Sequence, residues 1–406
     1  MEEKLEKYAS VILESCLKIK GGEPLFISAN SEVSYFVRII ANKAYSLGIK
    51  DIYFDITDVY LKHDALLNLD YEDLKNMSFW NKDKWNEYAK KGASFIMLAS
   101  ENPGLMSDIN QKKLSKLTAY ALKTRKEFDD LRDKSLVPWT IAAVPTESWA
   151  KQVFPKSLNP IEDLWNKIFE ICAIDENNPE EIWDEKIDLL EERCKSMNKY
   201  NFKKLTYKNS LGTNFSICLP KEALWCSGRE HLASGKNVLV NYPTEEVFTS
   251  PDMNSANGIV YASKPLNYQD NMIDKFWIKF VDGKVVDYHA EVGEDTLKNM
   301  ISSCSNMDRL GEVALVSYDS PISNSNILFY ETLFDENASC HLALGDSFTE
   351  CFEGGLDITK EELLERGLNK CDNHVDFMIG TSDLSIIGET YDGKEIEIFK
   401  KGNFCI

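Results

Sequence analysis

Residues Pro24-Leu25-Phe26-Ile27-Ser28 form a short apolar run that follows two glycines and predicts a β-strand. A helical pattern extends from about Glu32 to Leu47, and Ile52-Tyr53-Phe54-Asp55-Ile56 is a second strand candidate. Because a helix between two strands carries the chain back across a sheet, this succession favours parallel pairing. We therefore expect the first half of the chain to be an open α/β domain with a largely parallel sheet.

The surrounding sequence extends this pattern. Residues 3 to 19 have the spacing of an amphipathic helix, and Ser94–Ala99 and Trp139–Val144 are further strand candidates. The glycine pair Gly21-Gly22 precedes a strand, whereas the turn that binds dinucleotides follows one, so no dinucleotide site is expected. Three tryptophans of this half are expected in the core or in an interface: Trp80, Trp85 and Trp149.

The second half of the chain has a different character. Residues 160 to 201 are helical and acidic, and strand and turn signals dominate after them. Asp282-Gly283 lies between two alternating runs, which is a hairpin signal, and a helix is expected over Glu294–Ile301. We expect an N-terminal α/β domain over residues 1–200 and a mixed α+β domain over residues 201–406.

Composition excludes several classes of partner. The 406 residues contain 66 acidic and 46 basic side chains, a net charge of −20, and no basic run. Nucleic acids and anionic membranes need clustered Lys and Arg, so neither is expected, and a solvated surface is the favoured explanation of the charge. The ten cysteines show no CxxC spacing, the first residues are acidic and amphipathic, and no apolar run is long enough to span a bilayer. These features favour reduced thiols and a cytoplasmic location.

Two of the five histidines lie in chemically distinctive stretches. His341 follows Asn337-Ala338-Ser339-Cys340 in a pattern that predicts a helix. His374 and Asp376 are two residues apart in an apolar run that predicts a strand, so both side chains leave the same side. Two imidazoles and a carboxylate suit a divalent metal such as zinc, cobalt or manganese, although each His could also be a hydrogen-bonded core residue.

Acidic residues upstream strengthen the metal interpretation. Glu312 lies at the head of a strongly apolar strand, where a lone acid is costly unless it is paired or bound to metal. Glu245 and Glu246 follow another apolar run, and in an extended chain they point to opposite faces. Only one of these two is therefore expected to enter the site.

Four ordered motifs resemble one enzyme family. They are TEEVFTSPD at 244–252, GEVALV at 311–316, TLFDENAS at 332–339 followed by a His, and HVDFMIG at 374–380. In this order they resemble the thermophilic metallo-aminopeptidases, the group of aminopeptidase T, aminopeptidase S and PepS. The resemblance is close over the C-terminal half and covers only length and general character in the N-terminal half.

The resemblance implies a pair of metal ions, an N-terminal domain that covers the cleft, and a homodimer. The family's metal ligands fall here on Glu246, Glu312, His341, His374 and Asp376. The family also has a catalytic Tyr, and the matching residue here is Phe348, which lacks the phenol oxygen.

The chemistry expected from the family is hydrolysis of the N-terminal peptide bond of short peptides by a water activated between two metals. Three carboxylates among five ligands require at least one shared Glu, and we expect Glu246 and Glu312 to be shared or bridging. Glu312 is thus also a candidate catalytic residue. Further acid-base candidates, each of which could instead be a surface, capping or supporting residue, are Glu245, Asp335, Glu336 and Glu350.

Two alternatives stay open. Because Phe348 replaces the family Tyr, the chain could be a metal-bound relative with weak or no cleavage that serves as a peptide-binding or structural dimer. An amidohydrolase acting on another amine or amide would have the same ligand set.

Overall fold

The computed structural model describes residues 1–78, 82–269 and 271–406. Trp80 lies outside the described residues. The chain divides into two compact units, one formed by residues 1–185 with 229–243 and the other by residues 186–228 with 244–406. The segment 229–243 thus belongs to the first unit although it follows position 200.

The first unit is built on a five-stranded sheet in the order β10-β4-β3-β1-β2, and all of its strand pairs are parallel. The strands are β1 (Leu25–Asn30), β2 (Ile52–Thr57), β3 (Ser94–Ala99), β4 (Trp139–Ala143) and β10 (Asn241–Tyr242). The first four match the predicted strands, so the expectation of a parallel α/β sheet is confirmed. The unit also holds the two-stranded ribbon of β8 (Arg229–His231) and β9 (Asn237–Leu239).

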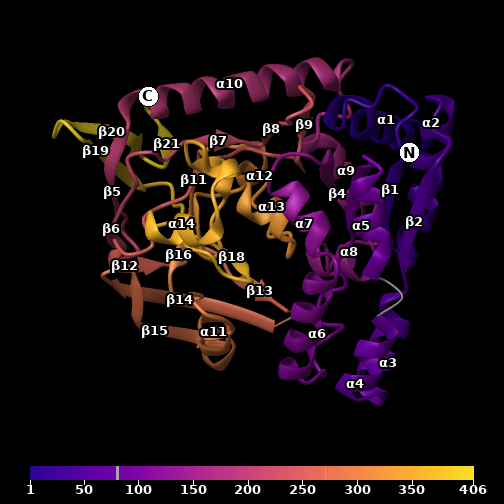
Figure 1. Ribbon diagram of the computed structural model, residues 1–406, viewed down its shortest axis with the longest axis horizontal. Coiled ribbons are helices and arrows are strands. Elements are labelled where there is room, and N and C mark those ends of the chain that lie inside the picture. Colours follow the sequence, from indigo (N-terminus) through magenta and orange to yellow (C-terminus); the bar gives the residue numbers. More distant parts are fainter. Residues whose placement is uncertain (79–81, 270) are drawn as a thin grey trace. The chain divides into compact units, whose positions relative to one another are not determined.

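Helices connect these strands (Figure 1). They are α1 (Glu2–Ser10), α2 (Ser34–Ser46), α3 (Val59–Asn68), α4 (Tyr71–Ser78), α5 (Lys82–Lys90), α6 (Gln111–Thr124), α7 (Lys126–Arg132), α8 (Glu147–Val153) and α9 (Pro160–Ile171), with the short turn η2 (Ser31–Val33). The helix predicted over residues 3–19 is present, but its second half, η1 (Val11–Cys16), has the wider winding of a π-helix. The long helix α10 (Pro179–Tyr200) crosses the boundary between the units.

Aromatic side chains fill the core of this unit. Phe26 on β1 stacks on Phe95 of the adjacent β3, with ring centroids 4.9 Å apart, and both rings contact Trp85. Trp149 is fully buried. Trp149 is thus a core residue, and Trp85 is partly buried and packs against the core, which agrees with the expectation of a core or interface position.

The second unit contains a nine-stranded antiparallel sheet with the order β13-β14-β12-β6-β5-β19-β20-β21 and with β15 paired to β14. Its strands are β5 (Phe202–Lys208), β6 (Asn214–Cys218), β12 (Asn257–Tyr261), β13 (Leu266–Tyr268), β14 (Asn271–Val281), β15 (Lys284–Val292), β19 (Ser385–Thr390), β20 (Glu395–Lys400) and β21 (Asn403–Phe404). The predicted hairpin at Asp282-Gly283 joins β14 to β15, and the predicted helix is α11 (Glu294–Ile301).

A second antiparallel sheet of this unit has the order β18-β17-β16-β11-β7. Its strands are β7 (Cys226–Ser227), β11 (Val247–Thr249), β16 (Leu310–Leu315), β17 (His341–Gly345) and β18 (His374–Met378). The remaining short elements are α12 (Pro321–Asn324), α13 (Thr332–Glu336), η4 (Thr349–Cys351), η5 (Gly355–Asp357) and α14 (Lys360–Glu365). Helices and antiparallel sheets together match the α+β class expected for this part of the chain.

One local prediction is wrong. The helix expected through His341 ends earlier, because α13 stops at Glu336 and His341 begins strand β17. Every residue of β17 is buried, so its sequence shows no alternation of apolar and polar residues. A short apolar run that is buried on both faces has no periodicity that separates strand from helix.

Candidate metal centre

Three adjacent strands of the antiparallel sheet β18-β17-β16-β11-β7 bring four of the candidate ligands to one face of that sheet. Glu312 on β16 lies opposite Ala343 on β17, and Ala343 lies opposite Asp376 on β18. Residues directly opposite in a sheet share a face, and so do residues two apart in one strand. His341 and His374 therefore lie on the same face as Glu312 and Asp376.

Small residues leave space between these ligands. Ala343 separates Glu312 from Asp376 with only a methyl group, and Gly345 lies opposite His374. Gly345 has a φ of +102°, and a Cβ there would lie 2.1 Å from the carbonyl oxygen of Asn373. A side chain at position 345 would therefore clash with the backbone beside His374, and Ala343 places only a methyl group between Glu312 and Asp376.

Glu246 reaches the site from the segment just before β11. The buried Asn337 accepts a hydrogen bond of 2.7 Å from the backbone N–H of Glu245, which fixes this segment. The Glu245 side chain pairs with Lys186, while a carboxylate oxygen of Glu246 lies 3.2 Å from Nε2 of His341. Of the two glutamates, Glu246 thus lies beside His341, whereas Glu245 is turned toward Lys186.

The five residues form two groups that could each hold a metal ion. Glu246, Glu312 and His341 make one group, and Glu312, His374 and Asp376 make the other, with the ligand atoms of each group within 4.8 Å of one another. Glu312 is common to both, whereas Glu246 belongs to one. The side chain of His374 keeps 24% of its surface exposed and that of His341 only 1%, so the second group is the more open one.

The hydrogen bonds of both histidines leave the same nitrogen for a ligand. Nδ1 of His341 lies 3.1 Å from the carbonyl oxygen of Ser339, and Nδ1 of His374 lies 2.8 Å from that of Asp346. A carbonyl oxygen only accepts, so Nδ1 carries the proton of a neutral imidazole and Nε2 carries the lone pair. Backbone partners of this kind orient metal-binding histidines in proteins.

Each Nε2 lone pair faces carboxylate oxygens, which also accept. Nε2 of His374 lies 3.1 Å from Glu312 and 3.2 Å from Asp376. The Glu246 oxygen beside His341 is buried and has no hydrogen-bond donor. Acceptors that face one another are stable only with a cation between them or with additional protons. The residues present therefore fit divalent metal ions.

Charge and burial shift the pKa values of these groups. Burial raises the pKa of Glu312 to about 7, despite the opposing effect of His374. Burial also opposes ionisation of Asp376, but the imidazole of His374 lowers the pKa of Asp376 to about 2. Burial alone lowers the pKa of both histidines, yet the surrounding carboxylates raise it well above the usual value. The site as a whole is thus strongly acidic and attracts positive charge.

The four acid-base candidates from the sequence fall into different environments. Glu245 is paired with Lys186, and Asp335 accepts hydrogen bonds from the backbone N–H groups of Phe329 and Glu331. Glu336 lies close enough to the ligands to feel their charge: burial, and then the charges of Glu246 and Asp376, raise its pKa well above the usual value. Glu350 lies on η4, outside the two ligand groups.

Phe348 lies beside the more open ligand group. Its ring centroid is 5.0 Å from that of His374 and 5.2 Å from that of Phe248. Its backbone N–H donates a hydrogen bond of 2.9 Å to Oγ of Ser250. Phe348, which the resemblance matched to a Tyr, therefore lies beside His374 as a ring without a hydroxyl.

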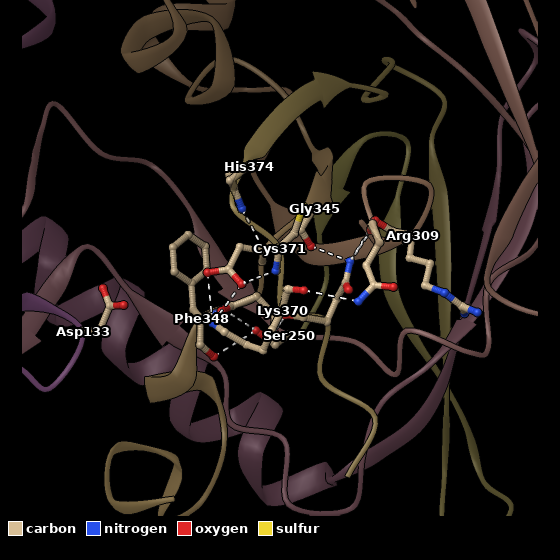
Figure 2. A network of polar contacts seen from close by, with 12 residues as sticks. Asp133, Ser250, Arg309, Gly345, Phe348, Lys370, Cys371 and His374 are labelled. Carbon is tan, nitrogen blue, oxygen red and sulfur yellow. Dashed lines mark hydrogen bonds and ion pairs between the residues drawn. The ribbon is translucent and has the colours of Figure 1, made fainter. Parts of the chain in front are cut away.

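A polar network holds Asp346, the residue whose backbone oxygen orients His374 (Figure 2). The carboxylate of Asp346 accepts hydrogen bonds from Nζ of Lys370, at 2.9 Å, and from the backbone N–H of Cys371, at 3.0 Å. The backbone oxygen of Asp346 is the partner of His374 Nδ1. Asn369 donates 2.7 Å and 2.9 Å hydrogen bonds to the carbonyls of Gly345 and Asn306.

Sequence reasoning missed these supporting residues. Ser339 and Asp346 orient the histidines through backbone carbonyls, which any residue could provide, so no sequence signal marks them. Asn337 is fully buried and polar, and its place between two acidic residues and a small apolar one gave no periodic signal.

Comparison with known proteins places this geometry in a family. The chain matches the model of the thermophilic metalloprotease family (M29) over residues 1–404. It belongs to this family. The chain is 38% identical to aminopeptidase AmpS of Bacillus subtilis (strain 168) over 410 residues, covering 99% of this chain and 98% of the relative. It is also 38% identical to aminopeptidase 2 of Geobacillus stearothermophilus over 406 residues, covering 100% of this chain and 98% of the relative.

The fold agrees with a solved structure of the family. Wild-type AmpT from Thermus thermophilus matches with a TM-score of 0.92 and 29% identity over 100% of both chains. The resemblance inferred from the four motifs is confirmed, and the chain is a metalloprotease-family hydrolase. Among its described residues, the helices are all too short or too polar to cross a membrane.

Proposed function

We propose that this protein is an aminopeptidase that uses two divalent metal ions, zinc, cobalt or manganese, to release N-terminal residues from short peptides. The observation that carries the proposal is the double ligand group with Glu312 in common, in which imidazole lone pairs face carboxylates. The names of the relatives support an exopeptidase that acts at the N-terminus. We also propose that residues 201–406 carry the catalytic centre, that the protein is cytoplasmic, and that it is a homodimer, as the family resemblance implies.

The ligands divide between two positions in this proposal. Glu246 and His341 would hold one ion, His374 and Asp376 would hold the other, and Glu312, which is common to both groups, would be a ligand of both. Three carboxylate charges against four positive charges leave a net positive centre. When bound, such a metal pair lowers the pKa of a water molecule toward about 7 and polarises a carbonyl group.

The side chains around the ligands have distinct tasks. Glu336 lies among the ligand carboxylates, whose charges raise its pKa, and is the candidate that would exchange a proton with water and the leaving amine. Ser339 and Asp346 hold the two imidazoles with Nε2 toward the carboxylates. The Phe348 ring lies against the His374 ring and would limit its rotation.

The Phe348 ring favours a second candidate function. A phenol at this position could stabilise the oxyanion of the tetrahedral intermediate, and loss of one such donor costs about 3 kcal/mol, or 10² to 10³ in rate. The second candidate is therefore a metal-bound relative that holds peptides and cleaves them slowly or not at all. An amidohydrolase of other substrates would differ only in the substrates that it accepts.

A peptide survey separates these candidates. Purified protein, stripped of metal and reloaded with zinc, cobalt or manganese, would be incubated with a mixed set of short peptides, with a chelated sample as control. Mass spectrometry should show a metal-dependent ladder that loses one residue at a time from the N-terminus. Intact peptides in a sample that still contains metal would favour the non-cleaving relative, and cleavage of non-peptide amides alone would favour the amidohydrolase.

A further inference from the structure

Two cysteines that are distant in sequence meet next to the metal centre. Cys304 lies in the turn after α11, and Cys371 lies three residues before His374. Their Sγ atoms are 2.7 Å apart, which is about 0.7 Å longer than a disulfide bond. Both are free thiols, and both side chains are only partly buried. The pair is therefore reduced, close together and within reach of small solutes.

Hydrogen bonds between the two segments hold the thiols in this position. Asn306 donates a hydrogen bond of 3.3 Å to the backbone oxygen of Lys370, and Asn369 donates one of 2.9 Å to the backbone oxygen of Asn306. Each bond joins the residues beside one cysteine to those beside the other. These hydrogen bonds join the two loops that carry the cysteines. Little chain entropy would therefore be lost when a bond forms between the thiols.

The two thiols differ in reactivity. The hydrogen bond from the Cys371 thiol lowers the pKa of Cys304 to about 7, although partial burial opposes this effect. The same hydrogen bond raises the pKa of Cys371, since it donates the proton. A thiolate, and not a thiol, is the nucleophile in oxidation and disulfide exchange. Cys304 is therefore the thiol that reacts first, and Cys371 is the one that resolves the product.

We infer that Cys304 and Cys371 are a modification site, a thiol pair that hydroperoxides oxidise to a reversible disulfide. The Cys304 thiolate attacks one peroxide oxygen, the O–O bond breaks, and Cys304 becomes a sulfenic acid while hydroxide leaves and takes up a proton as water. Cys371 then loses its proton and attacks the Cys304 sulfur, forming the S–S bond and releasing a second water. In total, two thiols are oxidised by two electrons and one hydrogen peroxide is reduced to two waters.

The disulfide would act on the metal centre through the hydrogen bonds that join Cys371, Asp346 and His374 (Figure 2). The backbone N–H of Cys371 donates to the Asp346 carboxylate, and the Asp346 backbone oxygen orients His374. Bond formation draws Cys371 toward Cys304 and so shifts the anchor of Asp346. This step rests on the proposed function of His374 as a metal ligand, whereas the disulfide itself does not.

Mapping the disulfide tests the modification directly. The full chain loaded with zinc, which is not redox-active, would be treated with hydrogen peroxide at pH 7, blocked with N-ethylmaleimide, digested without reduction and analysed by mass spectrometry. We expect a Cys304–Cys371 peptide pair, lighter by two hydrogen atoms than its parts, that dithiothreitol separates. Separate, alkylated Cys304 and Cys371 peptides after this treatment would overturn the proposal.

Cys405 provides a matched control, because it is an exposed cysteine whose pKa is raised by burial and by the charge of Glu397. With limiting N-ethylmaleimide at pH 7, Cys304 should react about tenfold faster than Cys405, and its rate should reach half its maximum near pH 7. Equal rates for the two would mean that exposure alone decides reactivity and would count against the pair.

Single variants separate the two roles. Cys371→Ser should leave Cys304 as a sulfenic acid that dimedone traps, and Cys304→Ser should leave Cys371 alkylatable after the same peroxide dose. Cys405→Ser should form the linked peptide as the unchanged chain does. Trapping of Cys371 in place of Cys304 would overturn the assigned order of attack.

Zinc retention and peptide turnover report the coupling to the metal centre. Oxidised protein should lose turnover about tenfold and recover it with dithiothreitol, while Cys304→Ser should be unaffected by peroxide. Zinc retained after gel filtration is measured in parallel, so the coupling is tested even if no peptide is cleaved. A linked pair with unchanged zinc retention and turnover would keep the modification and overturn its effect on the centre.

Discussion

Both units of this protein carry an acidic polar cluster at a sheet, but the partners of the carboxylates differ. In the first unit, Glu32 lies just beyond the carboxyl end of β1 and accepts hydrogen bonds from Asn30, at 3.2 Å, and from Asn102, at 2.8 Å. Asn102 in turn accepts from the hydroxyls of Tyr60 and Ser148. Donors and acceptors alternate through this cluster, so it is stable without a ligand.

In the second unit, the carboxylates of Glu312 and Asp376 face the Nε2 atom of His374, whose ring proton is held on Nδ1 by a carbonyl oxygen. Acceptors meet acceptors here, and a positive charge is required between them. An acid beside a sheet is therefore not by itself a sign of a metal. What decides whether a metal is needed is whether the group that the acid faces donates a hydrogen bond or only accepts one.

The largest expected effect comes from changing the shared carboxylate of the second cluster, Glu312, to its amide. Glu312→Gln removes the charge and the ligand common to both groups, so metal content should fall below two ions per chain. Turnover of a peptide should fall about 10³-fold, since the metal pair contributes several kcal/mol to the transition state. Elemental analysis and steady-state kinetics measure the two quantities.

Glu32→Gln is the matched control for this prediction. Its amide oxygen can still accept from Asn30 and Asn102, so metal content should stay as in the unchanged chain. If Glu32→Gln lost metal, or if Glu312→Gln kept two ions, the distinction between the two clusters would fail.

The second effect concerns the ring beside His374. Phe348→Tyr adds a phenol oxygen next to the open ligand group, and we expect turnover to rise about 10²-fold because one oxyanion donor is restored. Phe248→Tyr is the control, since this ring packs on Phe348 and adds a hydroxyl elsewhere in the same cluster. An unchanged or lower kcat in Phe348→Tyr would show that the missing phenol is not what limits this enzyme.

The parallel sheet could be predicted from sequence because its strands are continuous apolar runs separated by helical patterns. The same local reasoning found Glu312, His374 and Asp376, since an acid or a chelating pair in an apolar strand is conspicuous within a few residues. It also identified His341 as a candidate but predicted a helix there, because β17 is buried on both faces and offers no alternation.

Other parts of the site leave no trace in the sequence. The carbonyl oxygens of Ser339 and Asp346 act through the backbone, so their side chains carry no signal. Cys304 and Cys371 are 67 residues apart and meet only through the loops that Asn306 and Asn369 connect. Long-range contacts of this kind follow from topology and not from a local period.

The third prediction uses metal removal to compare the units within one molecule. A ligand that binds the folded state stabilises it by about 1.4 kcal/mol when its free concentration is about ten times its Kd, which slows local opening about tenfold. Chelation should therefore speed amide hydrogen exchange about tenfold in β16, β17 and β18, while exchange in β1 to β4 stays the same. Mass spectrometry of peptic peptides measures both sets together, and equal acceleration in both sheets would contradict a metal centre confined to the second unit.

The smallest expected effect concerns Asn102, a hydrogen-bond donor of the first cluster. Asn102→Ala removes the donor that lies 2.8 Å from the Glu32 carboxylate and the acceptor of the Tyr60 hydroxyl. Because the half-buried Glu32 carboxylate loses a donor beside the buried Asn102 position, the free energy of unfolding in urea should fall by about 1 to 2 kcal/mol. Metal content should not change, because no carboxylate of this cluster faces a lone pair. A variant that unfolded at the same urea concentration as the unchanged chain would show that water replaces Asn102 at no cost, and the first cluster would then resemble an open binding site more than a closed structural one.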